Sequence, residues 1–160
     1  MTIEWSGDDP ADVAERFDAL PSALESELEQ AAVDIGERIR SAANVNAPRD
    51  LGDLGNLLEA VTAVAGTLIE IRVGSNLDRA PAHEFGTDPG HFPPPDELRD
   101  WSRRNLGDPD LAFVVARSVA ETGIEESRFL RDAFEANLEW AIDRINRAVT
   151  DAFESVGLKS

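Results

Sequence analysis

A stretch rich in proline, glycine and histidine near the middle of the chain separates two helical halves. Residues 79–95, RAPAHEFGTDPGHFPPP, contain five of the nine prolines and both histidines. Proline fixes φ and removes a backbone donor, so we expect these residues to form a shaped loop and not a helix or strand. Loops held between rigid elements often carry function. The sequence therefore predicts that 79–95 is the functional loop.

Two long apolar stripes flank this loop, and both have the period of an amphipathic helix. The first helix is expected to end near residues 44–46, ahead of Pro48, and its stripe is Leu20, Leu24, Leu28, Ala31, Ile35, Ile39 and Ala42. The second begins near Glu126 or Ser127, and its stripe is Leu130, Phe134, Leu138, Ala141, Ile142, Ile145, Val149, Phe153 and Val156. Because the two stripes are similar in length, we expect the two helices to pack against each other.

Shorter elements fill the rest of the chain. A short helix from Asp9-Pro10 to about Ala19 is expected first, with Pro21 as a restart. Strands at 59–65 and 68–73, joined by Gly66-Thr67, predict a hairpin. Its second strand alternates, with one apolar and one charged face: Ile69, Ile71 and Val73 against Glu70 and Arg72.

Two further short helices are predicted between the loop and the last helix. The first starts at Pro95 with Leu98 and Trp101 inward, and Gly107 ends it. The second is capped by Asp108-Pro109 and ended by Gly123. Apolar residues lie on nearly every face of this helix, so we expect it to lie in the centre of the fold. The fold class is therefore α+β. Two long antiparallel helices pack on a small antiparallel hairpin, about 59–73, with two short helices and a long Pro-rich loop. All of it forms one domain, 1–160, after a loose lead-in, 1–9.

Charge is the most unusual part of the composition. The chain has 32 acidic and 15 basic residues, a net charge of −17, and Lys159 as its single lysine. Acidity combined with lysine depletion favours a high-salt cytoplasm, where salt screens repulsion between carboxylates. The alternative is an ordinary acidic protein. Such a negative charge disfavours binding of nucleic acid but suits a surface that DNA slides past.

Other totals restrict the class of protein further. The chain has no cysteine, so it has no disulfide and no thiol nucleophile. It has no apolar run near the length of a membrane span and no signal peptide, so we expect a soluble protein made in the cytoplasm.

The only histidine–carboxylate cluster is His83, Glu84 and His91. A helical zinc peptidase motif needs His-Glu-x-x-His, and the sequence here, HEFGTDPGH, has the wrong spacing and breaks the helix. One alternative is a metal site in the loop, with His83, His91 and Asp88 as ligands. The other is a structural role, with His83 as a packed side chain and His91 as a polar group of the loop. Close acid pairs, such as Asp50/Asp53 and Asp108/Asp110, are expected by chance among 32 acids. The sequence therefore predicts no catalytic residue, no metal and no cofactor.

Four segments in order resemble a known family. They are AANVNAPRDLGDLGNLL, APAHEFGT, HFPPPDELRDWSRRNLG and LAFVVARSVAETGIEESRFLRDAFE. Together with the intervening hairpin they resemble the tail-completion, or head–tail joining, proteins of tailed phages, also described as minor tail or virion-morphogenesis proteins. The resemblance runs from about Leu20 to the C-terminus. It departs from the family at Pro81, where an aromatic residue usually stands, and at Asp50, where threonine is common.

This resemblance implies a structural virion protein without catalysis. Such proteins form a ring of copies, usually six-fold, in the neck or at the head-proximal end of the tail. They contact the tail tube or tail terminator protein and the head-completion or adaptor proteins, and DNA only passes through the lumen. With the composition, it implies a haloarchaeal tailed virus, a protein made in the host cytoplasm and located in the virion, and no membrane.

The resemblance also implies which residues shape the subunit interface or the lumen. They lie in the segment Glu84–Thr87, in the loop 90–95 and at the other matching motif positions. The full set is Pro48, Gly52, Leu54, Ala82, Glu84, Phe85, Gly86, Thr87, Phe92, Pro94, Trp101, Gly123, Phe129 and Leu130. Two other functions stay open at this point. One is a small halophilic metal-dependent hydrolase that uses His83 and His91, and the other is a host helical interaction protein.

Overall fold

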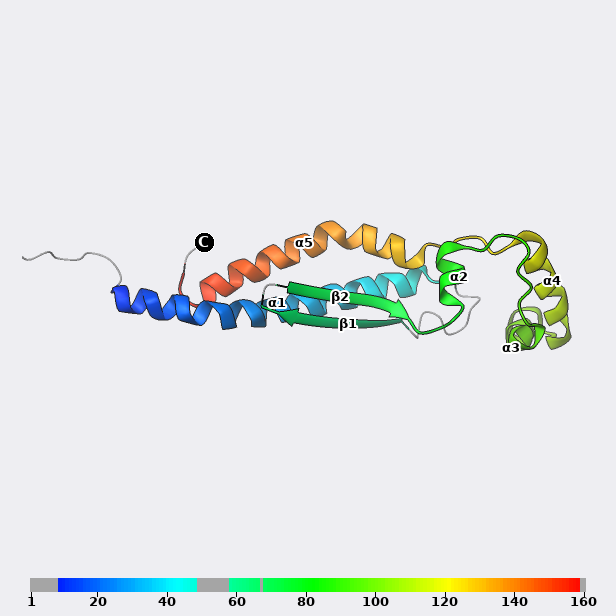
Figure 1. Cartoon of the computed structure of the whole chain (residues 1–160), viewed down its shortest axis with the longest axis horizontal. Coiled ribbons are helices and arrows are strands. Elements are labelled where there is room, and N and C mark those ends of the chain that lie inside the picture. The colour runs from blue at the N-terminus through cyan, green and yellow to red at the C-terminus, as the bar shows by residue number, and fades with distance from the viewer. Residues whose placement is uncertain (1–8, 49–57, 67, 159–160) are drawn as a thin grey trace, which may run out of the picture. The chain divides into compact units, whose positions relative to one another are not determined.

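The computed structural model describes residues 9–48, 58–66 and 68–158. The fold is α+β, as the sequence predicts, with long helices packed against a two-stranded antiparallel hairpin (Figure 1). The elements are α1 (Pro10–Asn46), β1 (Leu58–Ala65), β2 (Leu68–Ser75), α2 (Ala80–Phe85), α3 (Pro95–Leu106), η3 (Pro109–Leu111), α4 (Ala112–Thr122) and α5 (Phe129–Ser155).

The chain forms two compact units, and each contains part of α1, of the hairpin and of α5. Within the described residues, the first unit comprises 9–36, 61–66, 68–72 and 138–158, and the second comprises 37–48, 58–60 and 73–137. The expectation of a single domain over 1–160 stays a prediction.

In the first unit, α1 and α5 run antiparallel and pack part of their apolar stripes against the hairpin. Leu28 and Ala31 of α1 pack with Ala148 of α5, and partly buried residues join them: Leu24, Val64, Ile69, Ile145 and Val149. Arg16 donates to the carbonyl of Gly157, and the Arg144 guanidinium lies 2.9 Å from Asp34. These contacts confirm the predicted pairing of the two long helices.

In the second unit, the core forms where α1 ends and α5 begins. Its buried members are Ala43, Ala47, Leu58, Ala80, Phe129 and Ala133. Beside it, Arg38 Nε donates to Asn137 Oδ1 at 2.7 Å, and Asn137 Nδ2 donates to the Ala133 carbonyl at 2.7 Å. Asn137 is thus a buried polar side chain whose hydrogen-bonding groups are satisfied, which fixes the register of the two helices here.

Several local predictions are confirmed. Asp9 caps α1 by accepting from the Ala11 N–H at 2.9 Å, and α1 ends at Asn46. Gly107 ends α3 in a left-handed conformation, and Asp108 caps η3 by accepting from the Asp110 N–H. In β2 the apolar face is the less exposed face, as the alternation predicts.

Four local predictions are wrong. Pro21 does not restart a helix, because α1 continues through it. The stretch 79–95 is not entirely a loop, since 80–85 form α2, where Pro81 stands in the first turn and its missing N–H leaves no helix bond unmade. The helix α4 is not central, because Phe113 and Val114 are each 59% exposed and only Ala112 and Ala116 are buried.

The fourth error concerns the first half of the α5 stripe. Phe134, Leu138 and Ile142 are largely exposed. The buried face runs instead through small residues and Asn137, because two helices approach most closely where side chains are short. It comprises Ala133, Asn137, Ala148 and Ala152, together with Ala141 of the predicted stripe. Among the described helices, none is long and apolar enough to cross a membrane.

Candidate functional site

Six of the predicted site residues come together where α2 and the α4–α5 connection meet, in the second unit. They are Glu84, Gly86, Thr87, Gly123, Phe129 and Leu130, here called the motif cluster. Two sequence segments about 40 residues apart supply them, and backbone hydrogen bonds join the segments. Two of the four segments that carry the family resemblance are therefore in direct contact.

A short antiparallel bridge holds the first side of the motif cluster. The Thr87 N–H donates to the Ile124 carbonyl at 2.9 Å, and the Ile124 N–H donates back to the Thr87 carbonyl at 3.1 Å. The Thr87 hydroxyl oxygen accepts from the same Ile124 N–H at 3.0 Å. Thr87, the second residue after α2, is thus fixed to Ile124, the residue that follows Gly123.

The two glycines are required by the closeness of these segments. Gly123 has φ +78°, and a Cβ there would lie 2.1 Å from the Thr87 carbonyl oxygen. Gly86 has φ +71°, and a Cβ there would lie 2.8 Å from the Ile124 carbonyl oxygen. Both contacts are with backbone that cannot swing aside, so any side chain would push the two segments apart.

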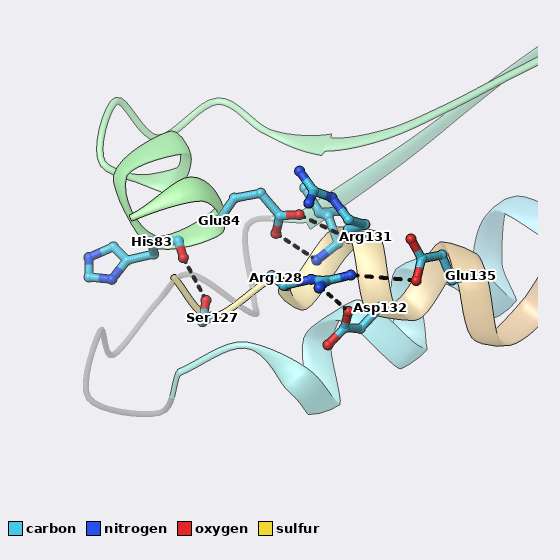
Figure 2. A network of polar contacts seen from close by, with 8 residues as sticks. His83, Glu84, Ser127, Arg128, Arg131, Asp132 and Glu135 are labelled. Atoms are coloured by element: carbon cyan, nitrogen blue, oxygen red, sulfur yellow. Dashed lines mark hydrogen bonds and ion pairs between the residues drawn. The ribbon is translucent and has the colours of Figure 1, made fainter. Parts of the chain in front are cut away.

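Glu84 holds the second side of the motif cluster by capping α5 from outside that helix. Its side chain is buried, with 5% of the residue exposed. Oε2 accepts from the Leu130 N–H at 2.8 Å. Oε1 accepts from the Arg131 N–H at 2.9 Å (Figure 2). These are N–H groups of the first turn of α5, which have no partner within the helix. A carboxylate also favours the positive end of the helix dipole.

Further contacts tie α2 to the residues just before α5 (Figure 2). Ser127 donates from both its N–H and its hydroxyl to the His83 carbonyl at 2.8 Å. Arg128 has φ +50°, an uncommon value for a residue with a side chain. Its guanidinium lies 3.2 Å from Asp132 and 3.5 Å from Glu135, so α5 itself holds this residue in place.

Apolar residues of the motif cluster anchor it in the core. Phe129 is fully buried, and Leu130 packs against the same core from a partly buried position. Trp101 of α3 packs there as well, as the prediction of an inward tryptophan requires. The start of α5 is therefore fixed both by hydrogen bonds and by packing.

Two exposed aromatic groups lie on segments that the motif cluster supports. Phe85, at the end of α2, is 62% exposed, and the Arg131 guanidinium lies 5.7 Å from its ring centroid. Phe92 and Phe113 are both exposed, and their rings are 5.7 Å apart with an interplanar angle of 59°. A guanidinium or a tilted ring at this distance is mildly attractive and keeps each aromatic ring in place.

The remaining predicted site residues lie elsewhere. Ala82 is half-buried within α2, and Pro94 is exposed immediately before α3. Pro48 is half-buried two residues after α1. Gly52 and Leu54 lie outside the described residues. None of these five residues is part of the motif cluster as defined.

The two histidines are in different surroundings. His83 is half-buried, and burial of its imidazole, with a smaller effect of the positive charge of Arg79, lowers the pKa of His83 below its ordinary value of 6.5. His91 is exposed in the loop that follows. In the described part of the chain, no three histidine, aspartate or glutamate side chains gather in a group that could hold a metal ion.

Sequence reasoning missed three residues that the site uses. The sequence marks Ser127 only as a possible helix start, although its hydroxyl donates to the His83 carbonyl. Arg131 and Phe113 were not singled out, although they contact the exposed Phe85 and Phe92. Their partners are 46 and 21 positions away in the sequence, and no periodic pattern links residues at such separations. Only a three-dimensional structure could have identified these pairs.

Comparisons with protein-family models, with curated proteins and with solved structures find no match to this chain. The features of this chain that bear on its function are therefore the motif cluster, the exposed side chains and the charge.

Proposed function

We propose that this protein is a structural subunit of a tailed virus, which forms a ring in the neck or at the top of the tail and joins tail to head. Copies of the chain bind one another and then bind tail-tube or tail-terminator and head-completion or adaptor proteins. The protein acts by contact and not by catalysis.

One observation supports this proposal: two of the four segments that resemble the tail-completion family meet in the motif cluster. Glu84, Gly86, Thr87 and Gly123 all make contacts between the two segments, although they come from distant parts of the sequence. The contact between these two segments gives the residues selected by the resemblance a shared place in the fold, which supports the proposal. The buried motif residues have a positioning role in this proposal.

The exposed residues of the same segments supply the contacts. Phe85, Phe92 and Phe113 present aromatic surface on segments held by hydrogen bonds and by core packing. Aromatic side chains are enriched at protein interfaces, and a rigid support lowers the entropy lost on docking. The net charge of −17 favours a lumen through which DNA passes without binding.

Electron microscopy of the purified protein at about molar salt tests the proposal, alone and mixed with tail tubes of the same virus. The expected result is a ring with a central opening that caps the tubes. A protein that remains a single chain and never joins a ring, a tube or a particle would contradict it.

A further inference from the structure

The hairpin tip, residues 61–66 and 68–72 in the first unit, has two unpaired backbone edges. The sheet contains β1 and β2 alone among the described strands. Across the described residues, no backbone hydrogen bond joins this tip to another element. In an antiparallel pair, every second residue of an edge strand points its N–H and C=O away from the partner strand. Both edges are therefore open to a further strand.

The burial pattern shows which backbone groups lie on these edges. Val64 and Ile69 pack into one core cluster, so they face each other across the hairpin. A two-residue loop makes Ala65 and Leu68 a hydrogen-bonded pair, and the next pair is then a non-hydrogen-bonded one. It follows that Thr62 and Val64 direct backbone groups to the edge of β1, while Ile69 and Ile71 direct theirs to the edge of β2.

Beyond Glu59, the edge of β1 lacks the features that normally protect an edge strand. Residues 60–65, AVTAVA, contain no charge, no proline and no glycine, in a chain of net charge −17. Val61, on the outward face, is 61% exposed. On β2 the outward charges neutralise each other, because Arg72 lies 2.6 Å from Glu70. Edge strands that stay single usually carry charges, proline or bulges that prevent pairing. This hairpin tip is therefore suited to pairing between copies that otherwise repel each other.

We propose that the edge of β1 pairs, antiparallel, with the edge of β2 of a second copy of this chain. Pairing of β1 with β1, or of β2 with β2, would leave the other edge of each hairpin open. Only pairing of β1 with β2, repeated around a closed ring, joins every edge to another strand. This inference adds to the proposed ring the strand pairing between neighbouring subunits, here called the seam. It rests on the proposed function, because only a closed ring pairs every edge.

The absence of cysteine from the chain allows a direct test by disulfide cross-linking. Outward residues such as Ala63 would form non-hydrogen-bonded pairs in the new seam, where Cα atoms lie about 4.5 Å apart, within reach of a disulfide. Chains carrying Ala63→Cys are mixed at about molar salt with chains carrying Leu68→Cys, Glu70→Cys or Arg72→Cys, which sample three registers. Single-cysteine chains are required because both strands belong to one hairpin.

The expected result is that one mixture gives a mixed disulfide dimer at least about tenfold faster than Ala63→Cys mixed with Glu139→Cys, an exposed control on α5. Faster linkage of Ala63→Cys to itself than in any mixture would overturn the proposal in favour of β1–β1 pairing. No mixture exceeding the control, while the unmodified chain forms rings, would overturn the seam and leave the ring standing. An unmodified chain that forms no ring would overturn both.

A second variant acts on the backbone itself. Thr62→Pro removes an N–H from the edge of β1 and leaves the bonds between β1 and β2 in place, because proline is tolerated on an edge strand. It is expected to reduce the ring fraction at least about tenfold, while Thr62→Val keeps it. Equal ring fractions for the two variants would contradict the seam.

Discussion

At the scale of single residues, Glu84 has the largest number of separate roles in the motif cluster. Its carboxylate caps α5 and its carbonyl accepts from the Arg128 N–H at 3.3 Å. We expect Glu84→Ala to lower the free energy of unfolding by about 2–3 kcal/mol, because two charge-assisted hydrogen bonds are lost and two N–H groups become unpartnered. Glu84→Gln retains one acceptor and is expected to cost about 1 kcal/mol.

Urea unfolding at fixed molar salt measures both variants. Glu139→Gln, which removes an exposed carboxylate from α5, is the charge control and is expected to change stability by less than about 0.5 kcal/mol. Equal effects at positions 84 and 139 would show that the cap does not stabilise the fold.

Gly123 provides a test of how closely the two segments approach. It has φ +78° and ψ −168°, a region open almost only to glycine, and a Cβ would contact the Thr87 backbone. We expect Gly123→Ala to cost more than about 3 kcal/mol. Gly107 has the same φ in the left-handed helical region, with open space around it, so Gly107→Ala should cost about 1 kcal/mol. Thermal unfolding of the pair checks this difference, and equal costs would contradict the close approach.

His83 provides a test by pH. Burial lowers the pKa of His83 in the folded state, with a smaller effect of Arg79, so the unfolded chain takes up the proton first as pH falls. The fold therefore loses stability as pH drops below about 6.5 toward the lowered pKa. We expect His83→Gln to lose less stability than the wild type between pH 7 and pH 5, measured by midpoint of thermal unfolding. An identical loss would contradict it, and His91→Gln controls for removal of one imidazole.

At the scale of elements, the sequence predicts where helices begin and end better than it predicts which of their faces are buried. Helix ends follow from local chemistry, so Asp9, Asp108, Gly107 and Gly123 all marked them correctly. The exposed face of α4 was not predictable. An apolar residue such as Phe113 gives the same sequence pattern whether it lies in a core or on a surface used for docking. The α2 helix was missed because proline counts as a breaker everywhere except in the first turn.

The exposure of α4 gives a prediction about this helix. Phe113→Ser is expected to lower the free energy of unfolding by about 1 kcal/mol or less, since the side chain is largely in solvent. Phe129→Ala, at a fully buried phenylalanine, is expected to cost about 3–5 kcal/mol. Urea unfolding of dilute protein compares the two. A large cost for Phe113→Ser would restore the central position that the sequence predicted for α4.

The candidate site was predictable only in part, because motif resemblance selects residues but not the contacts between them. Motif resemblance selected Glu84, Thr87 and Gly123, and the structure places these residues in contact. It gave no indication that Glu84 caps α5 or that Gly123 faces a carbonyl, because both facts depend on how distant segments meet. Resemblance identified the residues, and the contacts supply their physical roles.

At the scale of the whole molecule, charge is expected to control assembly. A net charge of −17 on every copy makes association unfavourable unless salt screens it. The Debye length falls from about 10 Å at 0.1 M salt to about 3 Å at 1 M, which is shorter than most distances between surface charges on neighbouring copies. A ring of this chain should therefore be stable at high salt and dissociate as salt is removed.

The mass of the purified protein in solution, measured by light scattering at about molar salt and again at low salt, tests the ring most directly. We predict one discrete multiple of the 17.4 kDa chain at high salt and a fall toward the single chain at low salt. A single chain at both salt concentrations, which also fails to assemble when mixed with tail-tube and head-completion proteins, would contradict the account.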